Sequence, residues 1–280
     1  MIKSWNELPL LVKVCVVLLC VMVLAVVFAD FLTPFDPDKT DLMNTTLSPI
    51  FMGGSLEHVL GTDELGRDVF SRVLYGARIS LGIALFGLLL GCSFGLVLGL
   101  TAGYFGGWWD RLSLLFINFQ QSIPFILFVL VGLVIFGRSI PVLIVLMGMA
   151  RWETYAKITR GLVLSLKKKQ YVEAAKCYNA SPLRILARYI FPGVRTYLIV
   201  LITLNFPLIL LVETSLSFVG IGVQPPTATL GQMVGTGKNY LVTAPWISVA
   251  PAIMIVMVAY CIQHIGEHMR ERFDVRLLEK

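Results

Sequence analysis

Residues 171–192, YVEAAKCYNASPLRILARYIFP, form the one long polar and basic segment between strongly hydrophobic ones. Ala174, Ala175 and Tyr178 have the spacing of one helical face. Asn179 then predicts a break, because Asn tolerates the left-handed conformation that closes many helices. We therefore expect a first short helix to end at this residue.

A second short helix is expected after the break. Ser181 can cap its N-terminus, and Pro182 suits its first turn. Pro192 is expected to end it. Its apolar positions recur at helical spacing and are Leu183, Leu186, Ala187 and Ile190. Two short amphipathic helices offer a compact knob to the groove of a partner, so this segment is interpreted as a docking element.

The same segment resembles the "EAA" loop of bacterial ABC importer permeases. The resemblance is carried by Glu173-Ala174-Ala175, by a turn residue four positions later and by Pro192 thirteen positions beyond that. The family's usual turn residue is glycine, where this sequence has Asn179. In that family the loop is the coupling helix, which sits in a cleft of the cytoplasmic ATPase. The resemblance gives that role to Glu173, Ala174, Ala175, Tyr178, Asn179, Arg184 and Pro192. An ordinary cytoplasmic helix–turn–helix remains the alternative.

Composition indicates an all-α polytopic membrane protein. Of the 280 residues 57% are apolar and only 14% are charged, against about 25% charged in a soluble domain. The net charge is +6, but the basic residues flank apolar runs and form no face that could read nucleic acid. The five cysteines show no CxxC spacing, and His264, Glu267 and His268 lack a third ligand in view. Neither a disulfide framework nor a metal site is expected.

Residues 8–29 are nearly all apolar and have the length of about 20 residues that a spanning helix needs. No good cleavage site follows them, so we interpret them as an uncleaved first span. Residues 1–7 are then the cytoplasmic N-terminus. Residues 30–78 follow as a long periplasmic segment rich in acidic residues.

The end of this periplasmic segment, GTDELGRDVFSR at residues 61–72, predicts an amphipathic helix in the membrane interface. Thr62 or Asp63 can cap it. Its apolar stripe is Val69, Val73 and Leu74, and its charged residues are Asp63, Glu64, Arg67, Asp68 and Arg72. We interpret these charges as a solvated, salt-bridged face and not as a metal or acid–base site. The run resembles the signature of the second permease of dipeptide, oligopeptide and nickel importers.

Residues 79–265 are expected to form a core of five further spans, with a coupling loop at 161–196 and a cytoplasmic tail at 266–280. The first of these spans, 79–104, places Gly87, Gly91, Gly95 and Gly99 in one row, so another helix can approach closely. A seam within the chain, a seam between subunits and generic packing all remain open.

Polar residues inside the later spans are candidates for the translocation pathway, since they are costly in lipid. They are Asn118, Gln120, Gln121, Ser122, Asn205 and Glu213. Pro124 is expected to kink the third span, which ends at Phe136. For the first four residues a position near the cytoplasmic interface is the alternative. For Glu213 a helix-end or subunit contact is the alternative to substrate binding.

Two further runs support the family resemblance. Residues 215–226, SLSFVGIGVQPP, are similar to the family's "LSFLGLG…PP" run. Residues 266–276 are similar to its closing "GDxLRDxxDPR" run. By this likeness Asp63, Arg67, Asp68, Gln224 and Pro225 are candidate contacts for a binding protein outside the membrane.

Lys and Arg concentrate in the segments that six spans would place inside, as the positive-inside rule requires. We therefore expect both termini and the docking segment in the cytoplasm of a bacterial cell, with the chain in its inner membrane. The resemblance implies a type I ABC importer permease fold without an ATPase site of its own, and no cofactor bound by this chain.

The resemblance also implies the partners. They are a paralogous permease in a heterodimer, two cytoplasmic ATPases that use ATP and Mg²⁺, a periplasmic or lipid-anchored binding protein and membrane lipid, with no nucleic acid. The expected cargo is a di- or oligopeptide. Nickel or another metal chelate, glutathione, opines and oligosaccharides remain alternatives. An ion-coupled secondary transporter is the alternative of another class, although no inverted repeat or midplane carboxylate is visible.

Overall fold

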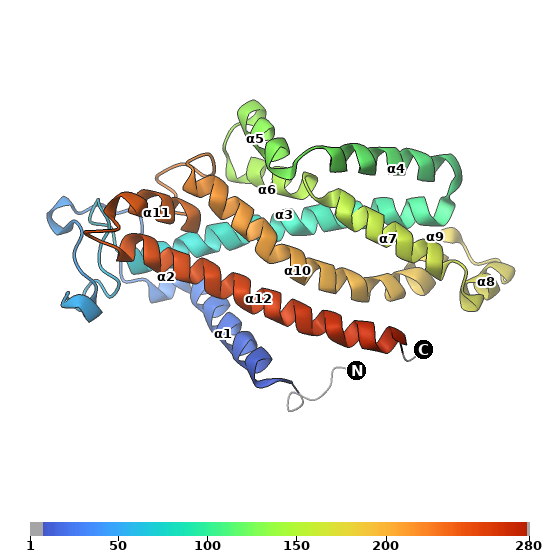
Figure 1. Cartoon of the computed structure of the whole chain (residues 1–280), viewed down its shortest axis with the longest axis horizontal. Helices are drawn as coiled ribbons and strands as arrows, with labels where there is room; N and C mark the ends of the chain where they lie inside the picture. Colours follow the sequence, from blue (N-terminus) through green and yellow to red (C-terminus); the bar gives the residue numbers. More distant parts are fainter. Residues whose placement is uncertain (1–7, 279–280) are drawn as a thin grey trace.

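The computed structural model describes residues 8–278 and confirms an all-α chain (Figure 1). No β-strand occurs in that range, where one isolated bridge joins Thr62 and Asp68. The predicted N-terminal segment 1–7 and the last two residues of the predicted tail, 279–280, lie outside the described residues.

Within residues 8–278, four helices are long and apolar enough to cross a membrane. They are α1 (Leu10–Val27), α3 (Val69–Phe105), α10 (Phe191–Phe218) and α12 (Trp246–Leu278). They correspond to the first, second, fifth and last of the six predicted spans. Each is a long run of apolar residues, which is the feature of a spanning helix that a sequence shows most directly.

The third predicted span is divided, so the structure differs here from one continuous helix. The third consists of α4 (Gly107–Ser122) and α5 (Phe125–Phe136), which meet at 87°. Pro124 causes this bend, because the residue before a proline avoids the helical region and Ile123 is extended. Counted as one bent span, this pair brings the total to five.

The fourth predicted span, α6 (Ile140–Met149), has ten residues. It is therefore only about 15 Å long, half of the hydrocarbon thickness of a membrane. A break at Ala150 and Arg151 separates it from α7 (Trp152–Leu166). Together α6 and α7 run along α3 (Figure 1).

The interface helix predicted from Thr62 onward is not present. Residues 60–68 form a loop, and the helix begins at Val69 with Asp68 as its N-cap. The Asp68 side chain accepts a hydrogen bond from the Ser71 backbone N–H at 2.8 Å, which fixes this start. From there α3 continues without a break through the predicted span. Its first apolar residues, Val69, Val73 and Leu74, are buried in the bundle.

The elongated bundle has two distinct ends (Figure 1). One end, here called the loop end, carries α2 (Ala29–Leu32), residues 33–68 and α11 (Leu230–Gly237). The opposite end, here called the α8 end, carries α8 (Gln170–Cys177) and α9 (Pro182–Ile185). The predicted coupling residues at the α8 end and the predicted contacts Asp63, Arg67 and Asp68 at the loop end are therefore separated by the whole length of the spanning helices.

The glycine row of α3 lies against α6 and α7. A Cβ atom at Gly91 would stand 2.6 Å from the Gly148 carbonyl oxygen, and one at Gly95 would stand 2.4 Å from the Trp152 carbonyl oxygen. A Cβ at Gly87 would stand 2.8 Å from Met147 Cβ, and one at Gly99 would stand 2.6 Å from the Ala156 carbonyl oxygen. The row thus forms a seam within this chain, where helices approach to backbone contact.

Candidate functional site

The predicted coupling segment, residues 161–196, forms a compact cap on the α8 end (Figure 1). Asn179 has φ +56°, the left-handed conformation that the predicted break requires. The Ala180 N–H donates to the Ala175 carbonyl at 3.1 Å, and the Asn179 N–H donates to the Lys176 carbonyl at 2.9 Å. This pair of bonds is the Schellman arrangement, which satisfies the last carbonyl groups of α8.

The inner face of α8 consists of Val172 and Ala175, which are buried against Ile185 and Ile190. The predicted shared face of Ala174, Ala175 and Tyr178 is therefore wrong, because Ala175 is buried while the other two are exposed. Only Ala175 points inward, because the i, i+3 pair with Val172 forms the apolar stripe. Ala174 is exposed, and the Tyr178 side chain is 89% exposed.

The second half of the segment also differs from the prediction. Leu183 is 76% exposed and does not belong to the buried stripe, which consists of Ile185, Leu186 and Ile190. Pro192 does not end a helix. A π-helical turn at Leu186–Ile190 leads directly into α10, where Pro192 occupies the first turn, the position that proline tolerates.

The exposed side of this segment is here called the tip surface and consists of Glu173, Ala174, Tyr178, Leu183 and Arg184. Arg188 and Lys176 are exposed beside it. Two large apolar side chains with charged neighbours at the polar end of a membrane bundle have the composition of a protein-binding patch. The segment thus buries one face in its own chain and presents the other.

Two contacts of charged side chains, one an ion pair and one a hydrogen bond to a carbonyl, fix α7 and the residue after it to neighbouring helices. The Arg160 guanidinium is paired with the Asp110 carboxylate of α4, with 2.7 Å between Arg160 Nη2 and Asp110 Oδ2. The Lys167 ammonium donates to the Tyr104 carbonyl at the end of α3 and lies 5.5 Å from the centre of the Tyr104 ring. A force on α8 and α9 would therefore reach α3, α4 and α7 together.

A second polar cluster lies where α6 meets α7. Arg151 Nη2 donates to Asn205 Oδ1 of α10 at 3.0 Å, and its guanidinium stands 5.6 Å from the Phe125 ring of α5. Arg151 Nε is buried without a hydrogen-bond partner. Gln120 Nε2 of α4 donates to the Met149 carbonyl at 3.3 Å. Four helices thus contribute to one polar junction midway along the bundle.

The structure brings only some of the predicted pathway residues to this junction. Gln120 and Asn205 lie there, while Gln121 accepts a hydrogen bond from Lys157 Nζ at 3.1 Å. Ser122 bonds to its own helix, and Asn118 is exposed on α4. Sequence reasoning did not propose Arg151 as a pathway residue. Its signal in the sequence is a cation placed directly after the apolar run 140–150.

Glu213 lies apart from the junction, at the loop end of α10, and is fully buried. Its Oε1 accepts a hydrogen bond from the Ser217 hydroxyl at 2.8 Å, and its Oε2 has no hydrogen-bond partner. The helix α11 covers this region, because a Cβ at Gly231 would meet the Thr214 carbonyl. Glu213 is enclosed by its own chain and does not line an open path.

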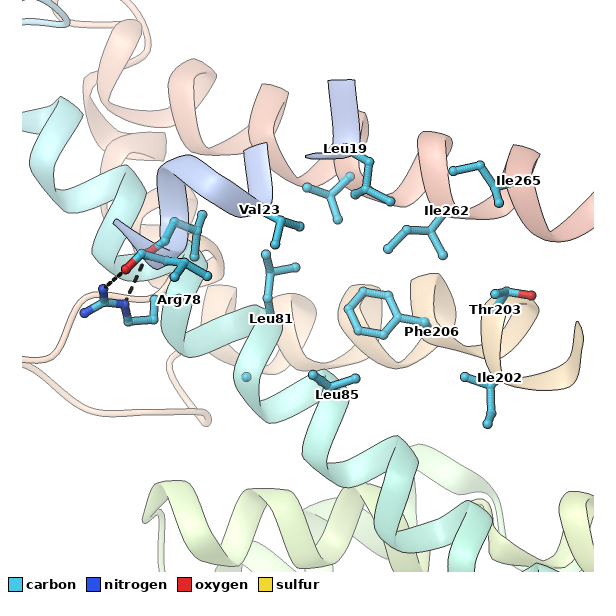
Figure 2. A pocket seen from close by; sticks show the side chains of 14 residues that line it. Leu19, Val23, Arg78, Leu81, Leu85, Ile202, Thr203, Phe206, Ile262 and Ile265 are labelled. Atoms are coloured by element: carbon cyan, nitrogen blue, oxygen red, sulfur yellow. Dashed lines mark hydrogen bonds between the residues drawn. The ribbon is translucent and has the colours of Figure 1, made fainter. Parts of the chain in front are cut away.

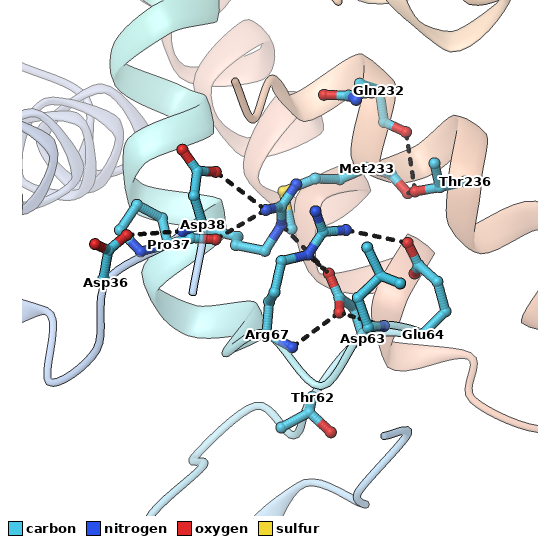
Figure 3. Close-up of polar contacts among 12 residues, drawn as sticks. Asp36, Pro37, Asp38, Thr62, Asp63, Glu64, Arg67, Gln232, Met233 and Thr236 are labelled. Carbon is cyan, nitrogen blue, oxygen red and sulfur yellow. Dashed lines mark hydrogen bonds and ion pairs between the residues drawn. The ribbon is translucent and has the colours of Figure 1, made fainter. Parts of the chain in front are cut away.

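The charged residues of the loop end form a buried network (Figure 3). Asp63 Oδ2 accepts from Arg67 Nε at 2.7 Å and pairs with Arg72 Nε at 3.4 Å. Arg67 Nη2 also donates to Glu64 Oε1 at 3.1 Å, and Arg72 donates to the Pro37 carbonyl at 2.8 Å. The interpretation as a solvated face is wrong, because these side chains are buried and their bonds hold the loop in its folded conformation.

Asp68 is likewise buried, where its Oδ1 lies 3.0 Å from His58 Nδ1. Asp63, Arg67 and Asp68 therefore do not present exposed side chains to a binding protein. Of the predicted contacts at this end, Gln224 and Pro225 are exposed. Among the residues that the structure describes, no group of three or more His, Cys, Asp or Glu could hold a metal ion.

Two family models match the chain. The model of the binding-protein-dependent transport system inner membrane component matches residues 95–274. The model of the N-terminal TM domain of oligopeptide transport permease C matches residues 11–49. The first covers the last part of α3, the helices after it and most of α12, and the second covers nearly all of α1 and the beginning of the loop end.

Curated relatives match over nearly the whole chain. The glutathione transport system permease protein GsiD of Escherichia coli O1:K1 / APEC is 33% identical over 91% of this chain and 83% of its own length. The oligopeptide transport system permease protein OppC of Haemophilus influenzae is 31% identical over 92% of this chain and 82% of its own length.

Solved structures share the fold. Inward-facing MetNI methionine ABC transporter superposes with a TM-score of 0.54 at 19% identity, over 71% of this chain and 95% of that one. An amino acid ABC transporter with histidines gives a TM-score of 0.54 at 14% identity, over 72% of this chain and 94% of that one. These likenesses confirm the predicted type I permease fold.

Proposed function

Because the chain belongs to the binding-protein-dependent transport system inner membrane component family of ABC importer permeases, we propose that it forms half of the translocation pathway of a peptide importer. Permeases of this family work with ATPases and with binding proteins. The other half of the pathway is a paralogous permease, so that the membrane part is a heterodimer. Two cytoplasmic ATPases and a periplasmic or lipid-anchored binding protein complete the importer.

The tip surface is the observation that carries the coupling role. It presents Tyr178 and Leu183 to solvent from a segment whose other face is packed into the bundle. Closure of the ATPases around ATP would move this segment, and the contacts of Arg160 and Lys167 would pass the movement to three helices. The two permeases would then rock between inward-open and outward-open states.

The chain itself contributes no ATPase site and binds no cofactor in this proposal, since ATP and Mg²⁺ are held by the partner ATPases. Both termini and the tip surface face the cytoplasm, and the loop end faces the outside of the bacterial inner membrane. Gln224 and Pro225, exposed at the loop end, are then available to the binding protein.

The polar junction and the exposed polar side of α4 line the pathway together with the sister permease. Asn118, Gln121 and Ser122 are exposed on α4. Exposed polar groups at the depth of a span are costly against lipid, so a water-filled path between two permeases explains them better. Arg151 and Asn205 would lie at the base of this path.

Peptides are the proposed cargo. Support comes from the two relatives, one named for glutathione and the other for oligopeptides. Uptake of a radiolabelled tripeptide by cells that express the importer tests this, with unlabelled glutathione, dipeptides, oligosaccharides and a nickel chelate as competitors. Competition by peptides alone supports the proposal, and competition only by the chelate or the sugar would assign another cargo.

The coupling role is tested by a charge on the tip surface. Leu183→Asp places a carboxylate where the ATPase would dock, and burial of an unpaired charge in an interface costs several kcal/mol. We expect the variant to insert normally but to lose ATPase on co-purification and to lose uptake. Val242→Asp is the matched control, because Val242 is 97% exposed at the loop end. Normal ATPase recovery with Leu183→Asp would refute docking at the tip surface.

Substitution by aspartate also distinguishes the exposed alanine of the segment from the buried one. Ala174→Asp changes an exposed position and should give a folded but uncoupled permease. Ala175→Asp buries a carboxylate against Ile185 and Ile190, so it should lower the amount of folded protein as well. Equal yields of both variants would contradict the assignment of inner and outer faces.

A further inference from the structure

An apolar groove of about 470 Å³ runs along the bundle between α1, α3, α10 and α12 (Figure 2). Its floor consists of Val26, Phe206 and Val258, all buried. Its rim includes Val23 and Leu85, which are more than 40% exposed. The groove therefore opens sideways from the bundle and not toward either end.

The groove lies within four helices that can span the membrane, so in a membrane something apolar must fill it. A hydrocarbon chain, which is much thinner than a helix about 10 Å across, suits a groove of about 470 Å³ lined almost entirely by aliphatic and aromatic side chains.

The end of the groove toward the loop end carries a charged pair, Arg78 and Asp30. Arg78 donates to the last carbonyls of α1, Val26 O at 3.2 Å and Val27 O at 2.7 Å, and to both Asp30 oxygens at 3.2 and 3.1 Å. These bonds use four of the five guanidinium N–H groups. The remaining Nη1 hydrogen, on a side chain that is 35% exposed, is available to an outside acceptor.

We propose that this groove is a phospholipid site, in which one acyl chain lies between α1, α10 and α12 and the phosphate accepts a hydrogen bond from Arg78. A lipid of the leaflet at the loop end has this layout, with an apolar chain directed into the bilayer and an anionic group at its surface. The lipid would connect α1 to the permease core along a surface where their side chains do not meet. The site does not depend on the transported cargo.

Gly82 gives the site a precise test, because it lines the groove and a Cβ there would meet no atom within 4 Å. Gly82→Leu fills the space of the acyl chain without displacing backbone. Gly161→Leu is the matched control, since Gly161 lies on α7, outside the groove, and its Cβ direction is also open. Gly82→Ala is an intermediate variant that keeps the series interpretable if the leucine variant is poorly folded.

The full-length chain, purified with its accompanying subunits, is placed in nanodiscs with phosphatidylglycerol that carries a diazirine on one acyl chain. After illumination, mass spectrometry should locate lipid adducts on Val23, Leu85 and Ile262. We expect the adducts to decrease with Gly82→Ala, to be lost with Gly82→Leu and to persist with Gly161→Leu. A diacylglycerol with the same diazirine chain should give weaker labelling, because it lacks the phosphate.

Three outcomes would overturn the proposal. Undiminished adducts with Gly82→Leu would show that the chain does not enter the groove. Cross-links of the groove residues to another subunit in place of lipid would show a protein occupant. Equal labelling by diacylglycerol would remove the role assigned to Arg78.

Discussion

Single methyl groups decide whether α3 can lie against α7. A Cβ at Gly95 would stand 2.4 Å from the Trp152 carbonyl oxygen and 2.9 Å from the Ala156 nitrogen, and backbone atoms cannot move aside cheaply. We expect Gly95→Ala to destabilise the protein by about 1–3 kcal/mol. Gly161→Ala, the same change at an open position, should be neutral or stabilising by up to about 1 kcal/mol. Thermal melts by fluorescence-detected size exclusion would compare them, and equal melting temperatures would contradict the seam.

Asn179 illustrates a second constraint at the scale of one residue. Its φ of +56° is tolerated by asparagine and glycine but strained for β-branched side chains. We expect Asn179→Gly to retain uptake and ATPase binding. Asn179→Val should cost about 1–2 kcal/mol at this position and turn the tip surface away from its partner. Uptake assays with both variants check this, and a fully active valine variant would show that the turn geometry is not needed.

Asp30 supplies a prediction on pH. The hydrogen bond from the Tyr75 hydroxyl and the neighbouring Arg78 guanidinium lower the pKa of the Asp30 carboxyl below its ordinary value of 3.8. A carboxyl with a lowered pKa stabilises the fold above that ordinary value, and the contribution is lost as the pH falls through the folded pKa. Cross-linking between α1 and α3 should therefore not change between about pH 5 and 8. A steep loss of cross-linking near neutral pH would assign the contact to another group.

At the scale of elements, the four long helices and the short pair around Asn179 could be predicted because their signals are local. A run of apolar residues and a residue suited to positive φ need no knowledge of neighbours. The division of the third span was less accessible, because Pro124 was expected to kink a helix but not to bend it by 87°.

The prediction of a solvated amphipathic helix at the loop end is wrong for a physical reason. Acidic and basic residues at helical spacing fit a solvated helix as well as a folded loop, and only packing distinguishes the two. Trp246, 184 residues away from Thr62 in sequence, donates its indole N–H to the Thr62 carbonyl at 3.0 Å and helps to enclose the loop. A contact at that separation leaves no pattern in either segment.

Asp63 is the centre of this element, and its removal should be costly. The side chain is 3% exposed and accepts bonds from the Leu65 and Arg67 backbone as well as from two guanidinium groups. Asp63→Asn leaves two buried cations without their shared carboxylate, and we expect a loss of about 3–5 kcal/mol. Asp36→Asn, at an exposed acidic residue, should change the melting temperature little. Similar melting of both variants would contradict the buried network.

At the scale of the whole molecule, the arrangement of the helices was available only through the family resemblance. Composition showed a polytopic membrane chain, but which helix lies beside which depends on contacts such as the glycine row against α6 and α7. The same holds for the candidate sites. The turn at Asn179 predicts the position of the tip surface. The junction at Arg151 is built by four helices that meet in space but lie far apart in sequence, so no local pattern predicts it.

Two distant thiols can test the proposed orientation of the whole bundle. Cys177 is exposed at the α8 end, while Cys15, Cys92 and Cys261 are buried. A membrane-impermeant maleimide should therefore label Cys177 in inside-out vesicles that have been stripped of the ATPase but not in intact spheroplasts. In a Cys177→Ser/Val242→Cys variant the labelling should reverse, because Val242 is 97% exposed at the loop end.

The ATPase adds a second expectation to this experiment. If α8 docks into it, Cys177 should be protected in inside-out vesicles until a wash with chaotrope strips the ATPase from the membrane, after which labelling should rise. The cysteine at position 242 should not respond to the wash. Cys20 is exposed toward the membrane on α1 and should stay unlabelled throughout, because a thiolate is disfavoured there. Labelling of Cys177 from the outside would show that the bundle has the opposite orientation in the membrane. The tip surface would then lie on the side that has no ATP.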